Sequence, residues 1–95
     1  MPAYIISRTR VNDDDLMQQY RTKALPMVKR YGGEYVARST AVEALDGIYD
    51  GRTLVIMKFP DAKTVRAFWN SPEYQEIRKL RLAATDSDVW LVAED

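Results

Sequence analysis

Two kinds of hydrophobic periodicity alternate along the chain. Four short segments are rich in apolar, aromatic and β-branched residues, as strands are: residues 4–9, 34–39, 52–59 and 87–92. The second is expected to continue toward residues 42–45. Between these segments, apolar residues recur three or four positions apart, which is the period of an amphipathic helix. The pattern predicts the order strand, helix, strand, strand, helix in two pieces, strand.

Local signals mark where the predicted helices begin and end. Asn12 or Asp13 can accept a hydrogen bond from the first turn of one helix, and Gly32-Gly33 is expected to end it. Pro26 interrupts that helix and predicts a kink. Pro60-Asp61 starts the next helix, and Ser71-Pro72-Glu73 starts a third that runs to about residue 84. The acidic run that begins at Asp13 is explained by capping and requires no metal ion.

This order of elements is the ferredoxin-like βαββαβ pattern. We therefore expect an α+β fold in which an antiparallel four-stranded sheet carries its helices on one face. The chain has 95 residues and no linker rich in Pro, Gly or Ser, so residues 1–95 are expected to form one domain.

The strands do not alternate apolar and polar residues, as an antiparallel sheet with one solvated face should. In the third strand, Leu54 and Ile56 lie on one face, and Val55, Met57 and Phe59 lie on the other. Helices can cover only one of these faces, and an exposed apolar face is unfavourable by about 25 cal/mol per Å². We therefore predict a homodimer whose open sheet faces pack together into a dimeric α+β barrel. The alternative is a monomer in which a loop or the C-terminal tail covers the second face.

Composition and charge exclude several classes of function. Lysine plus arginine number 14 and aspartate plus glutamate 14, so the net charge is zero, which argues against nucleic acid or a membrane surface as a partner. The absence of histidine and cysteine excludes Ser-His and Cys-His nucleophilic pairs and a haem held by either residue, and we expect no cofactor and no metal. No apolar run reaches the roughly 20 residues that span a bilayer, and no signal peptide is evident, so a cytoplasmic protein is expected.

Three motifs stand in an order and at spacings typical of a known family. They are Tyr31-Gly32-Gly33-Glu34-Tyr35, the segment Val42–Gly47, and Asn70-Ser71-Pro72-Glu73-Tyr74-Gln75, followed by Arg81. Together they resemble the Domain of Unknown Function 1330 family over nearly the whole chain. The resemblance implies a dimeric ferredoxin-like α+β barrel and no established biochemical role. Related barrels include cofactor-independent monooxygenases and lactone isomerases, a likeness of fold that transfers no chemistry by itself.

Tyr74 and Arg81 are candidates for ligand binding. They are seven residues apart, which is two helical turns, so they share one face of the predicted third helix. A guanidinium fork and a phenol side by side can hold a carboxylate or an enolate. The alternative is structural: Tyr74 is a core aromatic residue, and Arg81 is a charge favoured near the C-terminus of its helix.

Arg38 is the third candidate for ligand binding. It lies in the second predicted strand, on the same face as Val36. An arginine that faces a barrel interior is unfavourable unless a carboxylate or a bound anion neutralises it. The alternatives are a solvated charge on an edge strand, or a partner for Glu43 or for a carboxylate of the other subunit.

Three functions are compatible with these residues. In the first, the protein binds a small apolar, aromatic or organic-anion ligand in a pocket between sheet and helices, which Tyr74, Arg81 and Arg38 line. In the second, it is a cofactor-independent enzyme of the monooxygenase or isomerase type, in which Asp86 or Glu43 is the base. In the third, it is a structural or regulatory dimer without a ligand. A cavity lined by apolar and cationic groups distinguishes the first two from the third.

Overall fold

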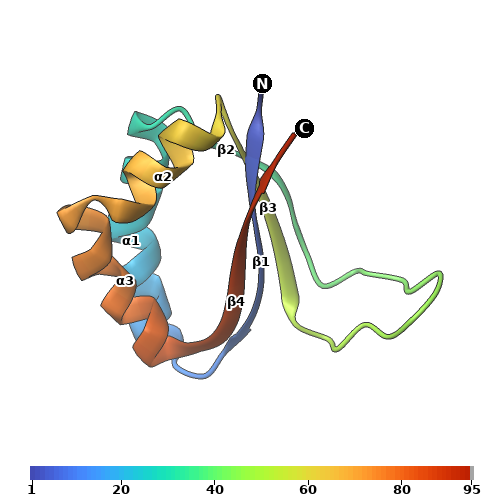
Figure 1. Cartoon of the computed structure of the whole chain (residues 1–95). Helices are drawn as coiled ribbons and strands as arrows, with labels where there is room; N and C mark the ends of the chain where they lie inside the picture. Colours follow the sequence, from blue (N-terminus) through green and yellow to red (C-terminus); the bar gives the residue numbers. More distant parts are fainter. Residues whose placement is uncertain (95) are drawn as a thin grey trace.

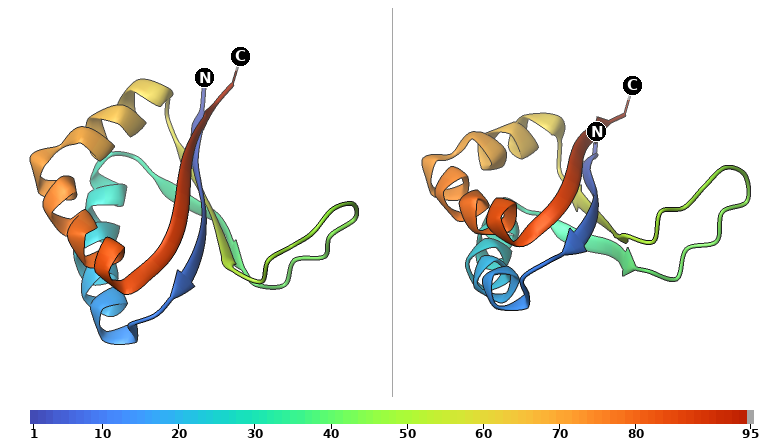
Figure 2. Two further views of the ribbon diagram at one scale, coloured as in Figure 1. Left: turned by 60° about the horizontal axis from the view of Figure 1, so that its bottom comes forward. Right: turned by 90° about the horizontal axis from the view of Figure 1, so that it is seen from below.

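The computed structural model describes residues 1–94 and contains four strands and three helices, in the predicted order. The elements are β1 (Ala3–Val11), α1 (Asp14–Arg30), β2 (Glu34–Ser39), β3 (Thr53–Phe59), α2 (Ala62–Asn70), α3 (Pro72–Ala84) and β4 (Thr85–Ala93). The strands form one antiparallel sheet in the order β2-β3-β1-β4, and all three helices lie against one face of it (Figures 1 and 2). The expected α+β, ferredoxin-like fold is therefore confirmed.

The expected extension of the second strand is wrong. β2 ends at Ser39, whose hydroxyl accepts the backbone N–H of Ala41 at 2.8 Å in place of a ladder bond. Residues 40–52 instead form an irregular arm that projects from the sheet, away from the helices (Figure 1). Gly47 and Gly51 take positive φ angles of 84° and 85°, which strands do not tolerate.

The predicted helix ends are confirmed. The carboxylate of Asp13 accepts the N–H of Leu16 at 3.0 Å, and α1 then continues through Pro26 as one helix. At its C-terminus, Gly32 has a φ of 78° and its N–H donates to the carbonyl of Lys29, while the N–H of Gly33 donates to that of Val28. This is a Schellman cap, which requires a left-handed residue at the first glycine.

The second glycine of the pair is required for a different reason. A Cβ atom at Gly33 would lie 2.7 Å from atoms of both Phe59 and Val28, closer than van der Waals contact allows. The absence of a side chain therefore lets the end of α1 pack directly onto the end of β3. Phe59 is 1% exposed and closes this end of the core.

The core lies between the helices and the covered face of the sheet. Its centre is aromatic: the ring of Phe68 on α2 lies 4.5 Å from that of Tyr74 on α3 and 5.7 Å from that of Phe59 on β3. Met27 and Val28 of α1 complete it. Every one of these side chains comes from a position that the helical or strand period assigns to the core.

No helix covers the opposite face of the sheet, and the arm contacts it only at one end, where Asp50 pairs with Arg8 at 3.2 Å. Ile6 of β1 pairs with Ile56 of β3 on one side and with Trp90 of β4 on the other, which makes an apolar row across three strands. Trp90 remains 46% exposed and Val92 42%. The arm does not fold back over this face (Figure 2). The sequence pattern of a sheet with two apolar faces is thus realised in the fold.

Candidate ligand-binding site

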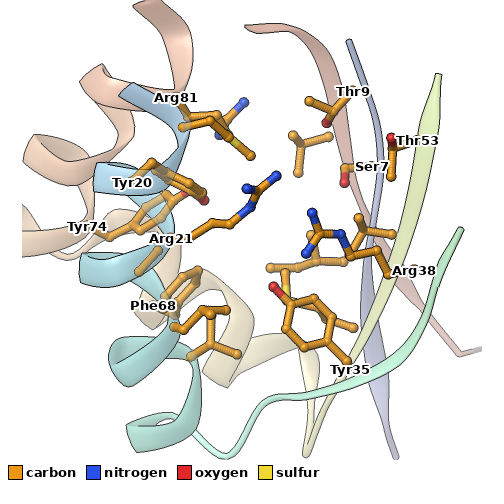
Figure 3. A pocket seen from close by; sticks show the side chains of 18 of the residues that line it. Ser7, Thr9, Tyr20, Arg21, Tyr35, Arg38, Thr53, Phe68, Tyr74 and Arg81 are labelled. Carbon is orange, nitrogen blue, oxygen red and sulfur yellow. The ribbon is translucent and has the colours of Figure 1, made fainter. Parts of the chain in front are cut away.

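A cavity of about 90 Å³ lies between the helices and the covered face of the sheet. Its walls come from α1, α2, α3 and all four strands. Leu25 of α1 and Tyr35 of β2 line it and are 37% and 48% exposed, so its mouth opens between these two elements. Figure 3 looks into this space and shows the polar side chains that surround it.

The helix wall is a stripe along α1. Met17, Tyr20, Arg21, Ala24 and Val28 line the cavity at the three- and four-residue spacing of one helix face. Arg21 is only partly exposed and extends into the cavity (Figure 3). Arg21 was not among the predicted site residues. Its position next to Tyr20, on the helix face where apolar residues recur, could have indicated that it lies near the sheet.

Hydroxyl groups gather at one end of the sheet wall. Thr9 of β1 pairs with Thr53 of β3 and with Ser87 of β4, which forms a row of three hydroxyl residues across three strands. Ser7 follows in the next row on the same face and also lines the cavity. The sequence analysis missed this row, although polar residues at inward-facing strand positions could have revealed it.

Arg81 is the most buried charged group at the cavity. It is 6% exposed, and its Nη1 donates to the hydroxyl of Ser87 at 2.6 Å. Its guanidinium carbon lies 6.0 Å from the ring centre of Tyr20 and 5.7 Å from that of Trp69, which are cation–π distances. Its buried Nε has no hydrogen-bond partner. A buried donor without an acceptor is unfavourable by about 1–3 kcal/mol.

Tyr74 lies beside Arg81 on the inner face of α3, as the seven-residue spacing predicts. Its hydroxyl is 2.9 Å from that of Tyr20, and both residues line the cavity. Burial of the Tyr20 hydroxyl, and then the neighbouring Tyr74, raise the pKa of Tyr20 above its ordinary value. Tyr20 therefore remains a neutral phenol at neutral pH and acts as a hydrogen-bond donor or acceptor. Tyr74 is 2% exposed in the core and also lines the cavity, and its predicted role in ligand binding remains a prediction.

Arg38 faces the cavity, but it does not share that face with Val36. A β-bulge shifts the register of β2: Tyr35 pairs with Met57, Ala37 with Ile56 and Arg38 with Val55. Met57 and Val55 face the cavity, so Tyr35 and Arg38 line it together and Val36 is the extra residue. A regular two-residue period could not predict this pairing. Arg38 itself is exposed, at the mouth of the cavity.

Three arginines thus surround one cavity. Arg21, Arg38 and Arg81 line it, and within residues 1–94 no aspartate or glutamate does. Among the described residues, no ion pair is formed by any of the three. Arg21 and Arg38 extend toward each other from opposite walls (Figure 3). The arrangement combines concentrated positive charge, hydroxyl groups and apolar walls.

The two carboxylates suggested as catalytic bases lie elsewhere. Glu43 is exposed on the arm, and Asp86 is exposed on β4, so neither lines the cavity. Within residues 1–94, no group of three or more histidine, cysteine, aspartate or glutamate side chains is placed to hold a metal ion. Over the same residues, no helix has the length and apolar character needed to cross a bilayer.

The fold and the cavity define a small α+β protein whose one antiparallel sheet and helix layer enclose a cationic pocket. The chain belongs to the family described as domain of unknown function (DUF1330), whose model matches residues 2–94. The resemblance found in the sequence is thereby confirmed. No curated protein sequence matches the chain.

Solved structures share the fold at low sequence identity. RPA0582, a protein of unknown function from Rhodopseudomonas palustris, has a TM-score of 0.79 and 20% identity, with 99% of this chain and 82% of that chain covered. SnoaB, a cofactor-independent oxygenase from Streptomyces nogalater, has a TM-score of 0.68 and 15% identity, with 99% and 93% covered. An uncharacterised NIPSNAP domain protein from Burkholderia xenovorans has a TM-score of 0.62 and 11% identity, with 100% and 95% covered. These likenesses establish the fold alone.

Proposed function

We propose that this protein binds a small organic anion in the cavity between the helices and the sheet. The observation that carries the proposal is the charge of the lining: three arginines and no carboxylate. Guanidinium groups that face one another without a counter-charge repel, and in a partly desolvated cavity the repulsion is stronger than in water. A carboxylate on the ligand would relieve this repulsion.

The volume of the cavity limits the ligand. Pockets that enclose drug-sized molecules measure about 300–1,000 Å³, and a cavity of roughly 150 Å³ holds benzene. A cavity of about 90 Å³ encloses a carboxylate with a few carbon atoms. A longer or aromatic ligand would extend through the mouth between Leu25 and Tyr35.

Binding is favoured over catalysis by the same lining residues. The enzyme hypothesis needs a base, and the cavity contains no carboxylate that could serve. The raised pKa of Tyr20 keeps that phenol protonated and removes it as a base near neutral pH. Tyr20, Tyr74 and Arg81 can stabilise an anion, but they do not generate one.

Calorimetric titration with butyrate, and with butyramide as the uncharged analogue, tests the proposal. Wild-type protein is expected to bind butyrate at least about tenfold more tightly than butyramide. Arg81→Met is expected to abolish the difference. Tyr74→Phe, which removes only a hydroxyl, should weaken butyrate binding while the protein stays folded. Arg66→Gln removes an exposed charge from α2, outside this cavity, and serves as the matched control. Equal binding of acid and amide would overturn the proposal.

We also propose that the protein is a homodimer in which the open sheet faces pack together. The support is the uncovered apolar row Ile56–Ile6–Trp90, whose burial against a second copy would stabilise the assembly. Ionic groups flank the row: Arg8 donates to Asp88 at 2.8 Å on the same face. A two-fold axis through this face would bring the apolar rows of two copies together.

Light scattering at micromolar concentration tests the dimer. The expected mass is twice the 11.0 kDa of one chain. Trp90→Asp places a charge in the proposed interface and should halve the mass. Leu82→Asp changes a residue that is 51% exposed on α3 and should leave the mass unchanged. A wild-type mass of one chain would defeat the proposal.

A further inference from the structure

Arg38 and Arg81 lie toward opposite edges of the sheet, although Arg81 itself belongs to α3. Arg38 lies on edge strand β2, and Arg81 donates to Ser87 on edge strand β4. Three strand spacings separate these edges, which is about 14 Å between backbones. The long Arg38 side chain reaches inward, and its guanidinium faces Arg21 rather than Arg81 (Figure 3).

The two ends of the cavity also differ in burial. Arg81 is 6% exposed and is surrounded by the rings of Tyr20 and Trp69 and by the hydroxyl of Ser87. Arg38 is exposed, and Arg21 is partly exposed. Solvent enters from the mouth, so Arg81 marks the deep end and the pair Arg21–Arg38 marks the outer end.

A ligand with a single carboxylate leaves this charge pattern unbalanced. A carboxylate at Arg81 occupies the deep end and leaves Arg21 and Arg38 facing each other without a counter-charge. A carboxylate between Arg21 and Arg38 leaves the buried positive charge of Arg81, which forms no ion pair among the described residues, without a counter-charge. Each outcome retains an unfavourable interaction that a second negative group would remove.

We infer that the ligand is a short, flexible dicarboxylate with a chain of about four to six carbon atoms. The inference rests on the proposed anion binding and specifies its substrate class. One carboxylate accepts from Arg81 at the deep end, near the hydroxyls of Tyr74 and Thr9. The other lies between Arg21 and Arg38 at the mouth. The methylene groups between them pass over the row Val55–Ser7–Val89, in which two valines flank one hydroxyl.

The absence of a charged side chain from the row Val55–Ser7–Val89 supports a separated pair of charges rather than one compact dianion. Along β1, the residues that face the cavity change from Ile5 to Ser7 to Thr9, so hydroxyls concentrate near one end only. A phosphate group would need donors on several sides at a single point. The three arginines are instead divided between the two ends of the cavity, with Arg21 and Arg38 at the mouth and Arg81 at the deep end.

Calorimetry with glutarate, monomethyl glutarate, butyrate and inorganic phosphate tests the inference. Glutarate is expected to bind wild-type protein at least about tenfold more tightly than its monomethyl ester or butyrate. In Arg38→Gln, glutarate affinity should fall to about that of butyrate, while butyrate affinity changes less than about twofold. Arg38 is exposed on an edge strand, so this variant is expected to fold. Arg66→Gln, the control outside this cavity, should leave all affinities unchanged.

The outcomes separate the two proposals. If glutarate binds no more tightly than butyrate, or if Arg38→Gln weakens both equally, the dicarboxylate inference is overturned and anion binding stands. If phosphate binds more tightly than glutarate, a compact dianion replaces the extended one. If none of the four anions binds, anion binding itself fails. Arg81→Met should weaken glutarate and butyrate alike, because both use the deep end.

Discussion

The two faces of the sheet are built from alternate residues of the same strands, yet they hold their charges in opposite ways. On the open face, Arg8 and Arg52 pair with Asp50 and Asp88 at 2.8–3.3 Å. Against the covered face, Arg38 of β2 and two helix residues, Arg21 and Arg81, line a cavity to which the described part of the chain contributes no carboxylate. Paired charges near solvent contribute little energy and limit which surfaces can approach. Unpaired charges in a cavity are unfavourable until a ligand neutralises them, and that difference supports the proposed binding on the covered face.

The apolar residues of the two faces differ as well. On the covered face, Phe59 and Ile5 are 1% and 4% exposed beneath the helices. On the open face, Trp90 and Val92 are 46% and 42% exposed. The same strand composition therefore produces a core on one side and an unoccupied interaction surface on the other. Substitutions on the covered face should change the stability of the fold, whereas those on the open face should change assembly and its dependence on charge.

The largest expected effect is the loss of the aromatic ring that closes the core. Phe59→Ala should reduce the free energy of unfolding by about 3–5 kcal/mol, because it removes buried apolar area and leaves a cavity under α1. Ile48→Ala, on the arm at 97% exposure, should change it by less than about 0.5 kcal/mol. Urea denaturation at one fixed protein concentration measures both. Similar losses in the two variants would contradict the division between core and surface.

A smaller loss is expected where the helix layer meets the covered face most closely. Gly33→Ala places a Cβ 2.7 Å from Phe59 and Val28, and the overpacking should reduce the free energy of unfolding by about 1–3 kcal/mol. Gly47→Asn is the comparison, because nothing lies within 4 Å of that position and asparagine tolerates a positive φ. Its effect should stay below about 1 kcal/mol. If Gly33→Ala left the free energy of unfolding unchanged, α1 would have to be able to move away from β3.

Alkaline pH should act through the covered face. The pKa of Tyr20 is raised in the folded protein, so its stabilisation is present below the ordinary tyrosine pKa of 10.0 and is lost as pH rises above it. The free energy of unfolding of wild-type protein is expected to fall above about pH 10, and less steeply in Tyr20→Phe. Chemical denaturation between about pH 8 and pH 11 measures the slopes. Identical slopes would mean that Tyr20 ionises as readily in the folded chain.

Acid should act through the open face, with the smallest effect. The backbone N–H of Arg52, assisted by the charges of Arg8 and Arg52, lowers the pKa of Asp50. Its stabilisation is therefore present above the ordinary value of 3.8 and is lost as pH falls through the lower folded pKa. Asp50→Asn should flatten the acid limb of the stability profile slightly. Raising the salt concentration should reduce the difference between Asp50→Asn and wild-type protein, since these charges are exposed. An identical stability profile in the variant would show that Asp50 contributes nothing to the free energy of unfolding.

Much of this fold could be predicted from the sequence because its signals are local. The caps at Asp13 and Ser71 and the glycine pair after Tyr31 act within one helical turn, so their residue types reveal their places. In β3, the two-residue period of a strand alone predicts that Leu54 and Val55 lie on opposite faces of the sheet. The arm was mispredicted because Val42 to Leu45 has strand-like composition, but no neighbouring strand is available to pair with it beyond Ser39.

The site could be predicted only in part, because it depends on which elements meet. The helical period placed Tyr74 and Arg81 on one face of their helix. Because the sequence contains no histidine and no cysteine, mechanisms that use these residues were excluded. Only the tertiary structure brought Arg21 of α1 opposite Arg38 of β2, since that contact joins two layers of the fold. The bulge at Val36, which turns Tyr35 and Arg38 to the same face, arises from strand pairing and has no local sequence signal. Residue types determined what chemistry was available, and the packing of helix against sheet decided where its charges converge.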